Sequence, residues 1–226
     1  MLQYKLVQSR RRTVAIHITK DAAVEVRAPL KMQNADIDRF VASKEQWIRA
    51  HLEMASARSA ACTAFTLDYG DQITLFGQAY PVAAGKGRAV SFDGTTVFVP
   101  PDLDPAEIKR AVIRLYRAIA KHTLHKRNEH FAELMGVQPA GIKITGAKTR
   151  WGSCSGKNSI NFSWRLVMAD EDVIDYVVTH ELAHIREHNH SPRFWATVEG
   201  VLPDYKARHK KLKLLQKKLA FEDWDE

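Results

Sequence analysis

The sequence is poor in cysteine and has no long apolar run. Cys62 and Cys154 are its only cysteines, so a disulfide framework is excluded and at most one bridge could form. No stretch reaches the roughly 18 consecutive apolar residues that a membrane-spanning helix needs, and the N-terminus lacks the apolar segment of a signal peptide. We therefore expect a cytoplasmic protein, with both thiols reduced and no membrane contact.

Internal repeats, low-complexity tracts and a glycine-rich phosphate loop are also absent. The missing loop argues against an enzyme that binds a nucleoside triphosphate through backbone amides. The chain has 226 residues, of which 45% are hydrophobic, so it is long enough for one large domain or two small ones with a real core.

Acidic residues are missing from one basic segment. The formal net charge is +8, and from Lys206 to Lys218 there are seven Lys or Arg and no Asp or Glu. Such a segment would attract phosphate groups, which predicts non-specific nucleic-acid contact. The same segment also fits the solvated face of an amphipathic helix, because an apolar side accompanies it: Leu212, Leu214, Leu215 and Leu219.

Residues 1–101 show mainly the patterns of short strands. Apolar residues alternate around residues 14–18 and 24–26, and again within 71–100, which predicts antiparallel hairpins. Between these regions, apolar residues recur at helical spacing over residues 34–56. We therefore expect an N-terminal β-rich unit with one inserted helix.

Residues 102–226 show mainly helical patterns. Asp104-Pro105 starts a helix that extends towards Leu134, and Asp170 starts another. The segments IKITG and SINFS predict short strands on either side of a loop, TRWGSCSGKN, and two more helices follow near 192–201 and 203–219. With a boundary near 102, the chain is predicted to be an α+β protein of two units.

The stretch HELAH, residues 180–184, predicts a metal site. On a helix His180 and His184 differ by about 40° in direction and about 6 Å in rise, so both imidazoles reach one cation. Glu181 beside them suits a general base that takes a proton from metal-bound water. A chance match on a polar helix is a weak alternative, because His180 and Glu181 interrupt an apolar run and burying them without partners is costly.

A catalytic zinc ion usually has three protein ligands, and several residues are candidates for the third. His188 would stand about 12 Å in rise from His180, too far to share an ion. His190 qualifies if the helix ends and the chain turns back, for which Asn189 is a suitable position. Other candidates are Glu199 and Asp204.

Four motifs together resemble the YgjP-like metal-dependent hydrolases, relatives of the SprT-type zinc proteins. They are TRWGSCS at 149–155, DYVVTHELAH at 175–184, NHSPRFW at 189–195 and PDY at 203–205. The resemblance extends from the N-terminal β region to the last helix. It implies a zincin-like catalytic unit with His180, His184 and His190 as zinc ligands and Glu181 as base. The spacing also equals that of metzincins, but Glu187 stands where those have a glycine.

Residues of the TRWGSCS loop are candidates for substrate binding. Arg150 would suit an anionic substrate or a developing oxyanion, and Ser153 offers a hydrogen bond. Trp151 with Gly152 equally fits a buried anchor and a tight turn. Cys154 has no metal-binding partner nearby in the sequence and is interpreted as structural.

These features predict a zinc-dependent hydrolase of metallopeptidase type that acts on a peptide, a protein or an anionic small molecule. One alternative is a metal-dependent nucleoside triphosphate pyrophosphatase, although Mg²⁺ with oxygen ligands would be usual there. Another is a nucleic-acid-binding module with structural zinc, although such sites normally have four ligands, mostly cysteine. The sequence leaves the natural substrate and the oligomeric state open.

Overall fold

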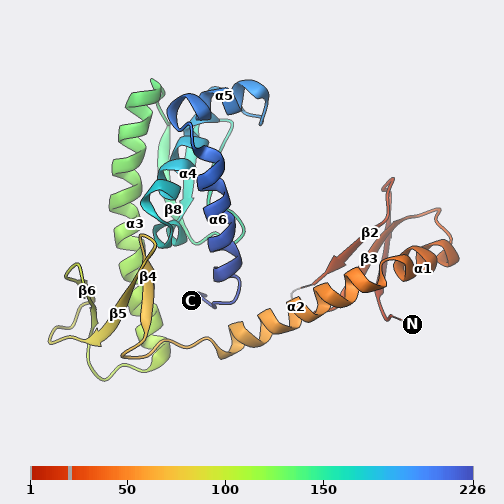
Figure 1. Cartoon of the computed structure of the whole chain (residues 1–226), viewed down its shortest axis with the longest axis horizontal. Helices are drawn as coiled ribbons and strands as arrows, with labels where there is room; N and C mark the ends of the chain where they lie inside the picture. Colours follow the sequence, from red (N-terminus) through yellow and green to blue (C-terminus); the bar gives the residue numbers. More distant parts are fainter. Residues whose placement is uncertain (1, 20–21, 226) are drawn as a thin grey trace. The chain divides into compact units, whose positions relative to one another are not determined.

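The computed structural model describes residues 2–19 and 22–225. The chain forms two compact units, each of which is described by itself (Figure 1). The first comprises the chain up to Phe65 together with Lys218–Asp223, and the second comprises Thr66–Lys217 with the last three residues. No helix in the described part of the chain combines the length and apolar character that a bilayer crossing requires.

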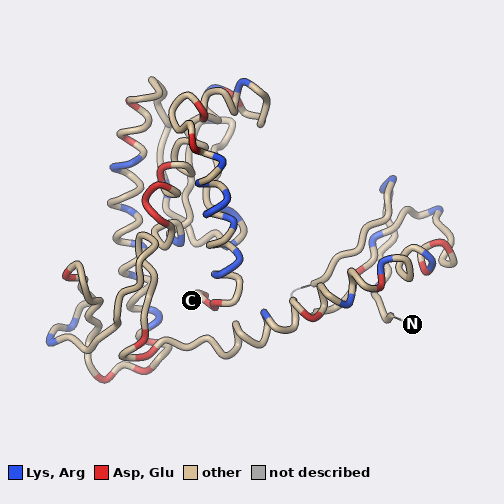
Figure 2. The backbone as a smooth tube through the Cα atoms, in the orientation of Figure 1, with Lys and Arg blue, Asp and Glu red and all other residues tan. Residues whose placement is uncertain are grey.

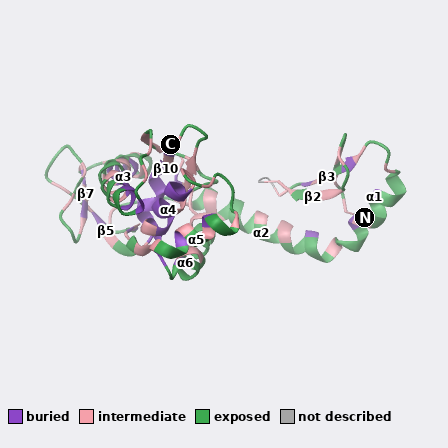
Figure 3. Ribbon diagram, turned by 90° about the horizontal axis from the view of Figure 1, so that it is seen from above, coloured by how far each residue is buried: buried purple, intermediate pink, exposed green. Residues whose placement is uncertain are grey.

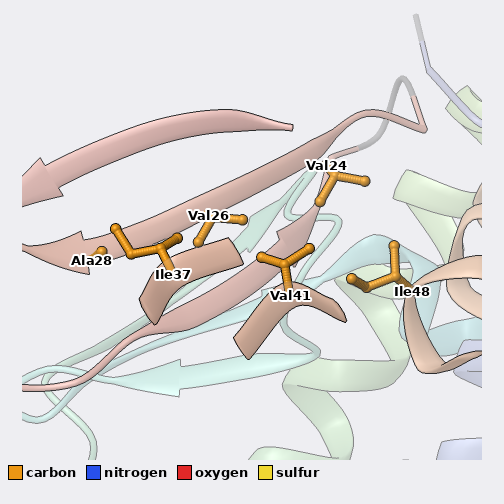
Figure 4. Close-up of a cluster of buried hydrophobic side chains, with 6 residues drawn as sticks. All are labelled: Val24, Val26, Ala28, Ile37, Val41 and Ile48. Carbon is orange, nitrogen blue, oxygen red and sulfur yellow. The ribbon is translucent and has the colours of Figure 1, made fainter. Parts of the chain in front are cut away.

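The first unit has a three-stranded mixed sheet of β1 (Lys5–Ser9), β2 (Ala15–Ile18) and β3 (Val24–Pro29). The order is β1-β3-β2, so β3 pairs with β1 in parallel and with β2 in antiparallel register. Figure 4 shows how three side chains of β3 meet apolar side chains of the following helices: Val24, Val26, Ala28, Ile37, Val41 and Ile48. Alternate residues of β3 therefore face this core, as expected for the central strand of the sheet.

The helical region of the first unit differs from the single helix predicted over 34–56. The structure has α1 (Asn34–Ser43) and α2 (Glu45–Ala64). At Lys44 the backbone leaves helical geometry, with φ −110° and ψ 12°, and its N–H donates to the carbonyl of Val41. The apolar spacing continues through this break, because Val41 and Ile48 face the same core, so the pattern did not reveal it.

The second unit begins with a four-stranded mixed sheet, ordered β4-β5-β7-β6. Its strands are β4 (Gln72–Leu75), β5 (Gln78–Ala84), β6 (Ser91–Phe92) and β7 (Val97–Val99). The backbone N–H of Phe76, in the β4–β5 turn, donates to Val167. The sheet therefore belongs to the unit that carries HELAH, and the structural boundary lies after Phe65, not near 102. Local strand patterns could not show which unit the strands pack against.

The longest helix, α3 (Pro105–Met135), agrees with the helix predicted from Asp104-Pro105. Asp104 accepts from the backbone of Glu107 and the Glu107 side chain accepts from the backbone of Asp104, which forms a capping box. At the other end Gly136 adopts the left-handed conformation, with φ 61°. Both ends of α3 are thus defined by local sequence.

A second three-stranded sheet lies beside α3 and α4 (Figure 1). Its order is β8-β10-β9, made of β8 (Gly141–Thr145), β9 (Gly152–Cys154) and β10 (Ser159–Ser163), and a 3-10 helix, η1 (Trp164–Met168), follows. Part of the predicted TRWGSCSGKN loop is therefore strand β9. Ile160 and Phe162 of β10 are fully buried, and burial is dense around α4 in Figure 3.

Three helices complete the second unit: α4 (Glu171–Ala183), α5 (Pro192–Val201) and α6 (Tyr205–Leu219). Helices α5 and α6 agree closely with those predicted near 192–201 and 203–219, and α4 begins directly after Asp170, as predicted. The mixture of helices and small sheets confirms the α+β class.

Candidate metal centre

The structure brings His180, His184 and His190 together. One ring nitrogen from each lies within 4.8 Å of the other two. The Nε2 atoms of His180 and His190 are 3.1 Å apart. Ligand atoms that share a tetrahedral zinc ion at 2.0–2.1 Å are about 3.3 Å apart. The histidine cluster therefore has the donor type that such an ion requires, the His180–His190 pair has nearly the required spacing, and all three nitrogens lie within 4.8 Å of one another.

The cluster forms because α4 ends earlier than the sequence suggested. The helix stops at Ala183, not near Asn189, and His184 is its C-cap. The N–H groups of Arg186 and Glu187 both donate to the carbonyl of Ala183, which closes a tight turn. The chain then reverses, and His190 returns to the face of α4 that carries His180.

The start of α5 fixes the other side of His190. The Ser191 N–H donates to the Asn189 side chain at 3.2 Å, and Ser191 Oγ accepts from the Phe194 N–H at 3.3 Å. Ser191 is thus the N-cap of α5, with Pro192 in the first turn. The HSP sequence places His190 one residue before a well-defined helix start.

Burial keeps the imidazoles on α4 neutral. It lowers the pKa of His180 to about 3, with a further contribution from the neighbouring histidines, and it also lowers the pKa of His184. His184 Nδ1 lies 3.0 Å from the Glu187 carbonyl, which orients that ring. Within the described residues, the buried Nδ1 of His180 has no hydrogen-bond partner. Neutral rings leave a nitrogen lone pair for a cation.

Aromatic residues of α5 and α6 surround the histidine cluster. The Phe194 ring lies 4.5–4.9 Å from the three imidazoles, measured between centroids. Trp195 stacks on His190 at 5.6 Å with an interplanar angle of 24°. Trp195 also stacks on Tyr205 at 5.3 Å. His190 is the exposed member of the cluster and does not belong to α4. Stacking on Trp195 therefore restrains its imidazole ring.

Glu181 lies buried beside the cluster, with 6% of its surface exposed. Burial raises its pKa to about 7, while a hydrogen bond from the Cys154 backbone N–H and the charge of Arg150 act in the opposite direction. An added Cβ at Gly152 would lie 2.6 Å from the Glu181 carboxylate. The edge strand β9 therefore packs its backbone directly against this side chain.

Sequence reasoning noted that Gly152 permits close approach but did not identify Glu181 as the group approached. In the sheet, Gly152 pairs with Phe162 and Cys154 with Ile160. Gly152 and Cys154 alternate along β9 and therefore lie on the same face of the sheet, which packs against α4. The W-G-S-C motif was the only sequence signal for the contact between Gly152 and Glu181. Predicting that contact would have required the register of β9, which so short a strand does not reveal in sequence.

The other candidates for substrate binding lie in strand β9 or directly before it. Arg150 and Ser153 line a polar pocket of about 240 Å³, whereas Trp151 does not. Ser153 pairs with Asn161 and therefore faces away from α4. Burial raises the pKa of the Cys154 thiol, which does not favour a thiolate ligand.

The alternative third ligands are not in the histidine cluster. His188 and Glu199 are exposed. Asp204 pairs with Arg208 at 2.9 Å. Among the residues considered from sequence, His190 is the one that the structure places beside His180 and His184.

We expect Gly152→Ala to lower hydrolytic activity while the bound metal is retained. The methyl group would collide with the Glu181 carboxylate and displace it, whereas the three imidazoles lie on other segments. A ratio of metal to protein near that of the wild type, measured by atomic emission, together with a loss of turnover, is the expected result. Gly156→Ala is the control, because an added Cβ there meets no atom within 4 Å. Equal activity of the two variants would show that β9 does not position Glu181.

Comparisons with known proteins place this geometry in context. A family model described as YgjP-like, metallopeptidase domain, matches residues 12–214. A search of curated proteins gave no match. Two crystal structures of metallopeptidase zymogens are similar in part. Abylysin of Pyrococcus abyssi is 26% identical, with 42% of this chain and 94% of that chain covered and a TM-score of 0.38. Jannalysin of Methanocaldococcus jannaschii is 22% identical, with 42% of this chain and 96% of that chain covered and a TM-score of 0.37.

Proposed function

The chain belongs to the YgjP-like metallopeptidase family, and from this premise we propose that it hydrolyses peptide bonds with one zinc ion and Glu181 as general base. His180, His184 and His190 would hold the ion. The observation that carries the proposal is the convergence of these three ring nitrogens within 4.8 Å, beside a buried carboxylate. Three histidines leave one position of a tetrahedral ion for water, as catalytic zinc sites require.

The donor set fits zinc better than a harder cation. Imidazole nitrogen is a preferred ligand of zinc, whereas Mg²⁺ and Ca²⁺ prefer carboxylate and carbonyl oxygens. The Glu187 carbonyl fixes the His184 ring through Nδ1, so its Nε2 is left for the ion. His180 and His190 already face each other through Nε2.

When bound, the zinc ion would polarise the scissile carbonyl and make the attacking water more acidic. Glu181 would accept the water proton on a carboxylate oxygen and pass it to the leaving nitrogen. The Cys154 N–H holds the carboxylate in place, and burial excludes bulk water from it. A nearby cation favours the charged carboxylate, which keeps Glu181 available as a base at neutral pH.

An edge strand beside Glu181 supports a peptide substrate rather than a nucleotide. Within the described residues β9 pairs with no strand other than β10, so its other edge has no strand partner, although the Cys154 N–H already donates to Glu181. An extended peptide can add to such an edge through main-chain groups. Arg150 is the charged residue of the adjoining pocket and would contact an acidic part of the substrate.

The test is hydrolysis of a quenched fluorescent peptide library and of casein by the protein loaded with one equivalent of zinc. We expect peptide cleavage that a chelator abolishes and that added zinc restores, with one zinc ion per chain. Nucleoside triphosphates, assayed with zinc and with Mg²⁺, form the second arm. Triphosphate hydrolysis without peptide cleavage would overturn the proposal.

We also propose that the protein acts in the cytoplasm. Cys62 and Cys154 are both free thiols, as expected in a reducing compartment. Labelling of both thiols in protein isolated without reductant is the expected result.

A further inference from the structure

Six of the seven Lys and Arg residues of α6 fall into two groups that the sequence did not distinguish. Arg208 Nε contacts Asp204 at 2.9 Å, and an Arg208 guanidinium nitrogen donates to the Asp172 carbonyl at 3.0 Å. Lys211 Nζ lies 2.8 Å from Asp172 and 3.2 Å from Asp170. Arg208 and Lys211 thus connect α6 to the start of α4, and we assign them a role in packing these two helices together.

Four other lysines of α6 are exposed and form no ion pair with any described residue: Lys206, Lys210, Lys213 and Lys217. Their spacing of four, three and four residues keeps them within about 40° of one direction on a helix. The row spans about 16 Å. We refer to these four residues as the lysine row, and Figure 2 shows the density of basic residues along α6.

The lysine row and the buried residues of α6 lie on different faces of the helix. Tyr205 and Leu212, each 8% exposed, are the buried residues of α6. Like charges three and four residues apart repel one another and weaken an isolated helix. No acidic side chain interrupts the row between 206 and 218. The row is thus a concentrated positive charge that the folded unit leaves to solvent.

We propose that the lysine row binds the phosphodiester backbone of a nucleic acid, without reading its sequence. A row of lysine residues about 4.5–6 Å apart along the helix axis complements a line of phosphates. Lysine acts as a point charge toward phosphate and does not select a base. This inference does not depend on the proposed peptidase activity.

The test compares two variants that change net charge equally. The first replaces the lysine row by glutamine, as Lys206→Gln, Lys210→Gln, Lys213→Gln and Lys217→Gln. The control replaces four exposed lysines outside α6: Lys31→Gln, Lys86→Gln, Lys121→Gln and Lys126→Gln. Glutamine has nearly the helix propensity of lysine, and circular dichroism would verify that both variants fold. Binding of labelled 20-nucleotide single strands and 20-base-pair duplexes is measured from 50 to 200 mM salt.

We expect the wild type and the control to bind with affinities that fall steeply with salt and do not depend on base sequence. Removal of the lysine row should reduce the slope of log K against log salt by about 2.8 for single strands and about 3.6 for duplexes, if all four lysines contact phosphates. Absence of binding by the wild type, or an equal loss in both variants, would overturn the proposal. Vesicles with 30% phosphatidylserine form a further arm, and tighter binding to these than to nucleic acid would also overturn it.

Discussion

Glu181→Gln is expected to reduce peptide hydrolysis by about 100-fold or more, the scale typical for loss of a positioned general base. The change removes the proton acceptor but keeps the shape of the side chain. The glutamine carbonyl oxygen can still accept the hydrogen bond from the Cys154 N–H. Steady-state kinetics on the best peptide of the library would measure the effect.

Metal content and thermal stability should stay near those of the wild type in this variant, because Glu181 is not a member of the histidine cluster. Glu199→Gln is a matched control, since Glu199 is exposed on α5 and should tolerate the same chemical change. Near-normal activity of Glu181→Gln would refute the base assignment. Loss of zinc would instead make Glu181 a ligand and reopen the assignment of His190.

His190→Ala is expected to weaken zinc binding by more than about 100-fold. Even the loss of a residue that only orients a ligand typically costs 10–100-fold in metal affinity, and here a donor atom itself is removed. The fold should survive, because His190 is exposed. Competition with a chromophoric chelator would measure the dissociation constant directly, without reference to activity.

His188→Ala is the matched control for that variant. His188 is an exposed histidine two residues away and is not a member of the histidine cluster, so its removal should leave zinc affinity unchanged. If His190→Ala retained full zinc occupancy, Glu199 or Asp204 would become the preferred third ligand. To bind the ion, Asp204 would then have to give up its ion pair with Arg208.

The helix that carries HELAH could be predicted because its signals are local. A run of apolar residues at helical spacing, with an Asp before it, defines α4, and the four-residue separation of two histidines fixes their common face. The position of the helix end was less certain in sequence. Residues 184–187 contain neither Gly nor Pro, so the sequence has no marker for this turn.

Pairing between distant segments could not be predicted in the same way. The antiparallel pairing of β2 with β3 agrees with the hairpin expected from residues 14–18 and 24–26, but the parallel pairing of β1 with β3 was not expected. Strand β9 has three residues, too few for a periodic pattern. Its contact with Glu181 arises from tertiary register alone, and only the glycine at 152 hinted at it.

The β4–β5 turn has a consequence for how this protein can be divided. An added Cβ at Gly77 would overlap the Asp170 side chain, so the turn lies tightly against the residue that precedes α4. Gly77 has a φ of 77°, a conformation that glycine adopts without strain. A fragment cut near residue 102 would remove this support and uncover the apolar residues of η1. We therefore expect a stable fragment of the second unit to begin close to residue 66.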